Sequence, residues 1–261
     1  MSKILLIVLA NITACFATNF TISTQNLWHY TKSYESRLDS LIQNIDTEKA
    51  EIMTFQEAWK SIGGKSLFNV FIENEELNVH YYKTNNTIIM REGLAIASTY
   101  EQVGKKLAYT LPHSKKIFGK RIMIVSKIRL SNEKEIYVIN VHFSPFEDRK
   151  HERVDQLNFV IDKIRNHFSD RPVLLTGDFN QDQDDEFYRP LYDLGFRESA
   201  RKDQIGCTFC SENPLTDAPF NSKLDYIFYQ EEFLKLENVR KTFTENPISD
   251  HFGLRAEFSF H

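Results

Sequence analysis

The sequence predicts one α/β domain that spans about residues 18–261. Runs with strand character alternate with amphipathic helical segments along the chain. No repeat, low-complexity tract or Pro/Gly/Ser-rich linker divides it, and 41% hydrophobic with 26% charged residues is an ordinary globular composition. The formal net charge of −4 lacks the basic footprint of a general nucleic-acid coat protein. A mildly acidic enzyme can still hold phosphates through a metal ion.

Residues 1–17, MSKILLIVLANITACFA, differ from the rest. One early lysine, an apolar run and then small residues are typical of a secretory signal peptide, and the segment is too short to span a membrane. We therefore expect cleavage after Ala17 and a secreted or periplasmic protein. Residues 12–15 also resemble a lipobox that would anchor the chain at Cys15, but strand-like sequence begins at Phe20 and leaves almost no tether. A buried first strand is the remaining alternative.

Strands and helices are predicted in order from their periodicity. The strand-like runs are rich in β-branched and aromatic residues and cover residues 19–28, 51–59, 93–99, 120–130, 135–144, 172–180, 223–229 and 251–260. Apolar residues at helical spacing predict helices over residues 34–48 and 153–168. A third helix is predicted over residues 185–195, ending at Gly195.

Several of the predicted strands finish on polar side chains. Rigid strand ends are where α/β enzymes assemble their sites. The first two strands end near Asn26 and at Glu57. A lone glutamate at a strand end is usually solvated, but a carboxylate beside an amide suits Mg²⁺, which takes a few oxygen ligands and keeps several waters.

Two later strands carry further candidates. His142 shares one strand face with Asn140, and it is either a core histidine bonded to a carbonyl or a group that stabilises a phosphate oxygen. In Gly177-Asp178-Phe179-Asn180, the acid and the amide lie on one face while Phe179 points into the core. This sequence is also a turn signal. Its position after an apolar strand favours a carboxylate that orients or deprotonates water and an amide that holds water or a phosphate oxygen.

An acid and a histidine near the end of the chain form a candidate pair. Asp225 lies within an apolar strand, and a buried carboxylate needs a partner. His251 is the best candidate, because an aspartate fixes the tautomer of a histidine and leaves its other ring nitrogen to take a proton from water. Asp250 would then face a metal or its water.

Cys207 and Cys210 form a C-x-x-C pair. A zinc site is disfavoured because no second ligand pair exists. A local disulfide fits an exported protein, and two free thiols are equally compatible with the sequence.

Short motifs occur in a fixed order: NLW (26–28), FQEAW (55–59), GLAIAS (93–98), VHFSP (141–145) followed by Arg153 and Gln156, GDFN (177–180), KLDYIFY (223–229) and SDH (249–251). Together they resemble the endonuclease/exonuclease/phosphatase superfamily, which includes DNase I, exonuclease III, inositol polyphosphate 5-phosphatases and neutral sphingomyelinases. The resemblance covers nearly all of the chain after residue 17. It implies a four-layer α/β sandwich in which two mixed β-sheets pack face to face, flanked by helices.

The same resemblance implies roles for the candidate residues. Those around a Mg²⁺ ion, with Mn²⁺ as an alternative, are Asn26, Glu57 and Asp250. Those that contact phosphate or orient the nucleophile are His142, Asp178 and Asn180. The acid–histidine dyad is Asp225 and His251. The implied reaction is attack of an activated water on a phosphodiester phosphorus.

Within the superfamily, NLW, EAW and TFCSENP resemble the neutral sphingomyelinase branch. This implies a secreted phospholipase C that releases phosphocholine from sphingomyelin and leaves ceramide at a membrane surface. Residues 230–248 contain no obvious aromatic-tipped hairpin for membrane contact. Phe146, Tyr81 and Tyr82 are aromatic candidates for that contact, but we expect them to pack in the core.

Two alternatives use the same fold. A secreted DNase I-like nuclease would have the same centre and a basic rim, for which GKKLAY, HSKKIFGKR and EDRKHER offer clusters. A non-catalytic binding protein or toxin subunit is disfavoured because Glu57, Asp178 and His251 are all present. No obligate protein partner is evident, and we expect a monomer.

Overall fold

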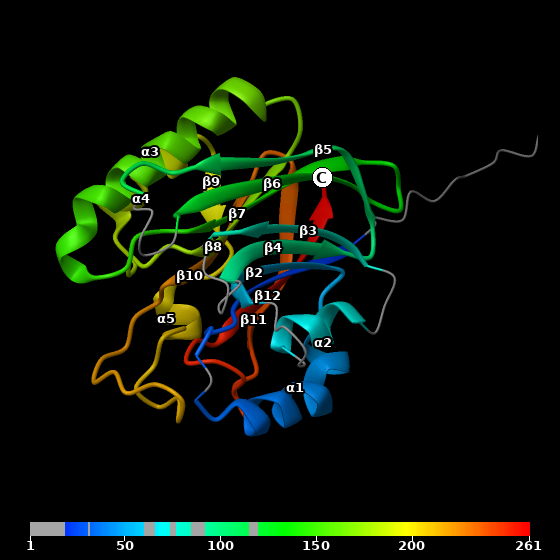
Figure 1. Ribbon diagram of the computed structural model, residues 1–261. Coiled ribbons are helices and arrows are strands. Elements are labelled where there is room, and N and C mark those ends of the chain that lie inside the picture. The colour runs from blue at the N-terminus through cyan, green and yellow to red at the C-terminus, as the bar shows by residue number, and fades with distance from the viewer. Residues whose placement is uncertain (1–18, 31, 60–65, 74–76, 85–91, 115–119) are drawn as a thin grey trace, which may run out of the picture.

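The computed structural model describes residues 19–30, 32–59, 66–73, 77–84, 92–114 and 120–261. The predicted signal peptide, residues 1–17, lies outside these ranges. The described residues form two six-stranded sheets packed face to face, with α1 and α2 covering one outer face and α3 and α4 the other (Figure 1). The predicted α/β sandwich with two mixed sheets is confirmed.

The first sheet has the strand order β11-β12-β1-β2-β4-β3. Its only parallel pair is β1 with β2, and the other neighbours are antiparallel. The bounds are β1 Phe20–Asn26, β2 Ile52–Trp59, β3 Asn78–Lys83, β4 Glu92–Ser98, β11 Leu234–Thr242 and β12 Gly253–Phe260.

The second sheet has the order β5-β6-β7-β8-β10-β9, and here β7 and β8 are the parallel pair. Its bounds are β5 Glu101–Thr110, β6 Ile122–Arg129, β7 Glu135–His142, β8 Val173–Asp178, β9 Phe196–Glu198 and β10 Asp225–Gln230. The two sheets therefore share one arrangement, in which a central parallel pair has an antiparallel neighbour on each side.

The helices are α1 Tyr34–Glu48, α2 Leu67–Glu73, α3 Lys150–His167, α4 Asp185–Tyr192 and α5 Lys202–Ile205, with a 3₁₀ turn at Glu147–Arg149. The Asp184 carboxylate caps α4 by accepting from the amides of Glu186 and Phe187. This helix ends at Tyr192, three residues before the predicted end at Gly195. Gly195 itself lies in the turn that follows, with φ 79°. None of the described helices has the length and apolar character needed to cross a bilayer.

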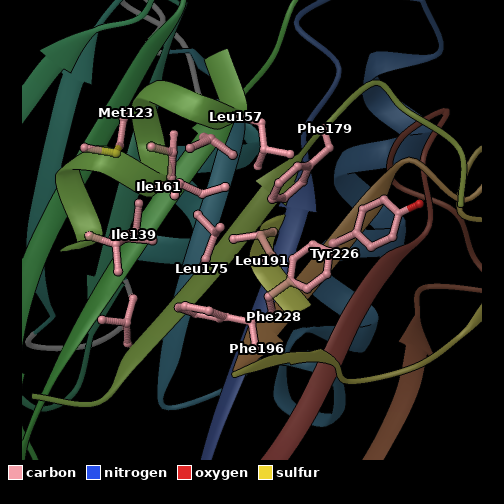
Figure 2. Close-up of a cluster of buried hydrophobic side chains, with 14 of the residues drawn as sticks. Met123, Ile139, Leu157, Ile161, Leu175, Phe179, Leu191, Phe196, Tyr226 and Phe228 are labelled. Atoms are coloured by element: carbon pink, nitrogen blue, oxygen red, sulfur yellow. The ribbon is translucent and has the colours of Figure 1, made fainter. Parts of the chain in front are cut away.

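Apolar side chains fill the spaces between all four layers. One cluster lies between the two sheets, a second under α1 and α2, and a third between the second sheet and α3 and α4. Figure 2 shows the third cluster, in which Leu157 and Ile161 of α3 face Leu175 of β8 and the rings of Phe179 and Phe228. Phe179 is fully buried, as predicted from the GDFN motif.

A polar contact also joins the two sheets. Asn140 of β7 is fully buried, and its Nδ2 donates to the carbonyls of Phe55 and Ala95, both at 2.9 Å. Its Oδ1 accepts from Gln56 Nε2 at 2.6 Å. Gln56 directly precedes Glu57. This contact therefore holds the two sheets together next to a candidate site residue.

Candidate active site

The topology brings six strand ends to one edge of the sandwich. The parallel strands β1 and β2 end there in the first sheet, as β7 and β8 do in the second. The strands β12 and β10 run antiparallel to β1 and β8, so they start at the same edge. In the second sheet, Asp178 pairs in register with His142 on one side and Asp225 on the other.

Asn26 links the two halves of the site. Its Nδ2 donates to Asp178 Oδ2 at 3.0 Å and to Glu57 Oε1 at 3.3 Å. Its Oδ1 accepts from the amide of Trp28 at 2.9 Å. One buried amide therefore fixes a carboxylate from each sheet.

A bulge in β2 aims Glu57 into the site. The pairing of β2 with β4 shifts between Phe55 and Ala58, and Glu57 has φ 50°, a conformation that costs energy in a residue other than glycine. His29 contacts Glu57 Oε2 through both its backbone amide, at 3.0 Å, and its ring Nδ1. Burial alone would raise the pKa of Glu57, but the hydrogen bonds and charge of His29 hold it well below its usual range. His29 directly follows the NLW motif and was missed, because a lone histidine in a loop carries no pattern.

Two further carboxylates lie within electrostatic reach of Glu57. Burial raises the pKa of Asp250, and the Glu57 charge adds to the rise while His251 opposes it. Burial and the Glu57 charge also raise the pKa of Glu92. Asp250 Oδ1 accepts from Ser249 Oγ at 3.1 Å. Glu92 was missed in the sequence, where it stands immediately before GLAIAS.

The GDFN segment holds Asp178 rigidly. Gly177 has φ 139°, and a Cβ there would lie 2.1 Å from the carbonyl oxygen of Val141, so only glycine fits before Asp178. The Asp178 Oδ1 accepts from the amide of Asn180 at 2.8 Å, and Asn180 Nδ2 donates to the Phe143 carbonyl at 3.1 Å. Burial raises the pKa of Asp178 to about 7, although the His251 charge opposes the rise.

The predicted acid–histidine pair forms. His251 Nδ1 lies 2.8 Å from Asp225 Oδ2, and Asp225 is fully buried. Although burial lowers it, the Asp225 carboxylate raises the pKa of His251 well above its ordinary value. Within the described part of the chain, Asp225 Oδ1 has no hydrogen-bond partner. Ligand atoms of Asp178, Asp225 and His251 lie within 4.8 Å of one another, and the Nδ1–Oδ2 distance between the last two is that of a hydrogen bond.

His142 completes the site from β7. Its Nε2 lies 3.5 Å from Asp178 Oδ2. Burial and then the charge of Arg121 lower its pKa well below the ordinary value, which favours the neutral ring. Arg121, from the HSKKIFGKR segment, is a half-buried cation within reach of Glu57 and Asp178. From the sequence this segment was only a candidate basic cluster for the rim, and its proximity to Glu57 and Asp178 was not predicted.

The structure also places the cysteine pair and the three aromatic residues singled out in the sequence. Cys207 and Cys210 form a disulfide in the loop before β10. The expectation of core packing holds for Tyr81, which stacks on Phe68 at 5.6 Å between ring centroids. It is wrong for Phe146, which is 67% exposed, and for Tyr82, which is 39% exposed on the edge strand β3. Phe146 is turned outward by a backbone with φ 76°, and Arg153 binds its carbonyl at 2.6 Å.

This fold and this convergence of carboxylates and histidines define a class of phosphoester hydrolase. The sequence profile of the Endonuclease/Exonuclease/phosphatase family matches residues 23–251, and the chain belongs to that family. Its members are hydrolases that act on phosphodiester or phosphate esters. No curated protein sequence matches the chain.

Solved structures share the fold at low sequence identity. The endonuclease/exonuclease/phosphatase from Bacteroides vulgatus has a TM-score of 0.73 and 17% identity, covering 94% of this chain and 100% of that one. D. rerio TDP2, complexed with a single strand DNA product, has 0.72 and 16%, covering 93% and 99%. The human Nocturnin catalytic domain, with a bound sulfate anion, has 0.68 and 14%, covering 93% and 95%.

Proposed function

We propose that the protein is an exported, metal-dependent phosphodiesterase that hydrolyses sphingomyelin to ceramide and phosphocholine. The observation that carries the proposal is the meeting of Glu57 from β2 and His251, just before β12, with Asp178 and Asp225 from the other sheet. These groups are far apart in the chain and meet at one edge of the sandwich, where Asp178, Asp225 and His251 are buried and Glu57 is partly buried.

The chain offers a set of ligands that fits a hard divalent cation. Glu57, Asp250 and Asn26 would hold it, since Mg²⁺ prefers a few carboxylate and carbonyl oxygens. The Glu57 charge adds to the raised pKa of both Asp250 and Glu92, and a cation would relieve that repulsion. When bound, Mg²⁺ or Mn²⁺ supplies a Lewis acid that stabilises charge on the phosphate oxygens.

The protein's own residues move the protons. A pKa of about 7 suits Asp178 to accept a proton from the attacking water near neutral pH. Asn180 fixes the Asp178 carboxylate through its amide. Since Asp225 holds the Nδ1 of His251, the protonated ring donates from Nε2 to a phosphate or leaving-group oxygen. His142 gives a second, neutral donor to the phosphate.

The surroundings of the site support a lipid substrate. Tyr30 is 55% exposed and stacks on His29 at 4.5 Å between ring centroids. Phe220 is also 55% exposed, and Phe209 connects it to His251, with centroid distances of 5.8 and 4.9 Å. Exposed rings beside a catalytic centre suit the interfacial region of a bilayer, where aromatic side chains have an apolar body and a polar edge to satisfy.

The other parts of the proposal follow the sequence. The signal-like residues 1–17 support export, without lipid anchoring at Cys15. We propose a monomer without an obligate protein partner, acting on a head group at a membrane surface. The second candidate is a DNase I-like nuclease, because one fold relative was solved with a single strand DNA product and because Arg121 adds positive charge to the site.

A substrate panel tests the function. The purified mature chain, with Mg²⁺ and with an EDTA control, is incubated with sphingomyelin, phosphatidylcholine, phosphoinositides and plasmid DNA. Sphingomyelin turnover that EDTA abolishes and Mg²⁺ or Mn²⁺ restores is the expected result. DNA cleavage with intact sphingomyelin would replace the proposal by the nuclease, and no turnover of any substrate would favour the binding protein.

Variants test the site within the same assay. His251→Ala and Asp178→Ala should each lower kcat by about 10²–10⁴-fold, the usual contribution of a general acid or base, while the far-UV spectrum stays unchanged. His151 is exposed on α3, so His151→Ala serves as the matched control and should keep full activity. Near-normal turnover in either site variant would place the chemistry elsewhere.

A further inference from the structure

We propose that the disulfide-closed turn Cys207-Thr208-Phe209-Cys210 is a positioning element for the Asp225–His251 dyad. The two cysteines are 6% and 0% exposed, and their Cα atoms lie 5.5 Å apart. Between them stand two residues that contact both members of the dyad. This inference rests on the proposed function, because it assigns a task to residues around the same centre.

Thr208 binds the strand that carries Asp225. It is fully buried, and its Oγ1 accepts from the amides of Leu224 at 2.9 Å and Asp225 at 3.1 Å. Its carbonyl accepts from the amide of Phe252 at 2.8 Å, the residue directly after His251. One threonine thus fixes the backbone of the acid and the backbone beside the histidine.

Phe209 covers the histidine ring itself. The two ring centroids are 4.9 Å apart, and Phe209 forms an isolated β-bridge with His251. A second bridge joins it to Ser222, with backbone hydrogen bonds of 2.9 Å in both directions. The phenyl ring therefore limits rotation of the imidazole and shields one of its sides from water.

The disulfide is what closes this turn onto the dyad. From the end of α5 at Ile205 to the start of β10 at Asp225, the described chain forms no helix or extended strand, only isolated bridges and turns. The two sulfurs pack with Phe252 in a small cluster of their own. A ring closed over four residues constrains the unfolded chain little, because stabilisation by a disulfide grows with loop length. Its main effect is therefore local order at Thr208 and Phe209.

The first test removes the disulfide. In the mature chain, Cys207→Ser/Cys210→Ser should keep its fold and KM, while kcat on the substrate found in the panel falls by about 10²-fold, as misplacement of a catalytic group by about 1 Å can do. Reduction of the wild type by dithiothreitol should give the same loss, and the reductant should not affect the double variant. Ser211→Ala, an exposed neighbour of the turn, is the matched control and should keep full kcat.

A readout without substrate separates this proposal from the proposed function. The hydrogen-bonded Nδ1 proton of His251 should give a downfield proton resonance in the wild type that is missing from His251→Ala. It should broaden or disappear in the double variant and persist in Ser211→Ala. A double variant with wild-type kcat and an unchanged resonance would overturn the proposal. If the wild type turns over no substrate, the resonance alone still decides.

A second pair of variants keeps the test informative if the double variant does not fold. Thr208→Val removes the acceptor for Leu224 and Asp225 but keeps the volume, so kcat and the resonance should both be lost. Thr208→Ser keeps the hydroxyl and should restore both. Equal behaviour of the two variants would show that Thr208 does not position the dyad.

Discussion

Replacing Asn140 with leucine should lower the free energy of unfolding by about 3–5 kcal/mol. Leucine fills a similar volume, so the cost comes from hydrogen bonds rather than from a cavity. The substitution removes two donations to the carbonyls of Phe55 and Ala95 and one acceptance from Gln56. A buried group left without its partner costs about 1–3 kcal/mol, and three groups lose a partner here. Gln56 keeps a hydrogen bond to Thr24 at 3.1 Å, so the total cost stays below three times the upper value.

Urea unfolding followed by far-UV circular dichroism measures this cost. The midpoint should fall while the slope with denaturant stays constant, because the surface exposed on unfolding does not change. Asn78→Ala is the matched control, since the Asn78 side chain is exposed and donates one hydrogen bond, to the Tyr100 carbonyl. It should cost about 0.5 kcal/mol or less. A loss below about 1 kcal/mol for Asn140→Leu, or equal losses for the two variants, would refute the polar contact as a determinant of sheet packing.

Two further predictions concern stability. Burial lowers the pKa of His80 to about 4, below the 6.5 of the unfolded chain, so the unfolded state takes up the proton first and stability falls as the pH drops from 6.5 to about 4. Over this window the free energy of unfolding of the wild type should fall by about 2 kcal/mol more than that of His80→Gln. This is less than the full pKa shift gives, because the Ser126 hydroxyl, 3.0 Å from Nδ1, can turn to accept a hydrogen bond from the protonated ring. Equal urea midpoints of the two proteins across the window would contradict this. Gly177→Ala should cost more than about 3 kcal/mol, because its Cβ would collide with the Val141 carbonyl, whereas Gly195→Ala, with φ 79° and nothing within 4 Å, should cost only about 1 kcal/mol of backbone strain. Thermal unfolding checks this pair, and similar losses would show that the collision is relieved at no cost.

The inner strands of both sheets were predictable from sequence, and the edge strands were not. All eight predicted strands occupy inner positions, and β3, β5, β9 and β11 are the four edges. An inner strand is buried, so its sequence is an apolar run. An edge strand pairs on one side only and contains charged residues, so its sequence lacks that pattern. In β5, for example, Lys105 and Lys106 are exposed. Helices α2 and α5 were missed because they are short.

The same contrast explains which site residues were found. Asp178 and His251 stand at ends of apolar runs and Asp225 stands within one, where a polar residue is conspicuous. His29, Glu92 and Arg121 come from loops and strand starts where charged residues are common, so only the folded arrangement brings them to Glu57. The sequence also could not reveal that Thr208 and Phe209 contact the dyad, since both contacts depend on how the loop folds back.

The pairing of β1 with both β2 and β12 has a consequence for biosynthesis. The strand that begins at Phe20 acquires its second neighbour only when residues 253–260 have left the ribosome. Such long-range pairings delay folding. The candidate site therefore cannot assemble on a nascent chain before the segment that carries His251 and β12 has been synthesised.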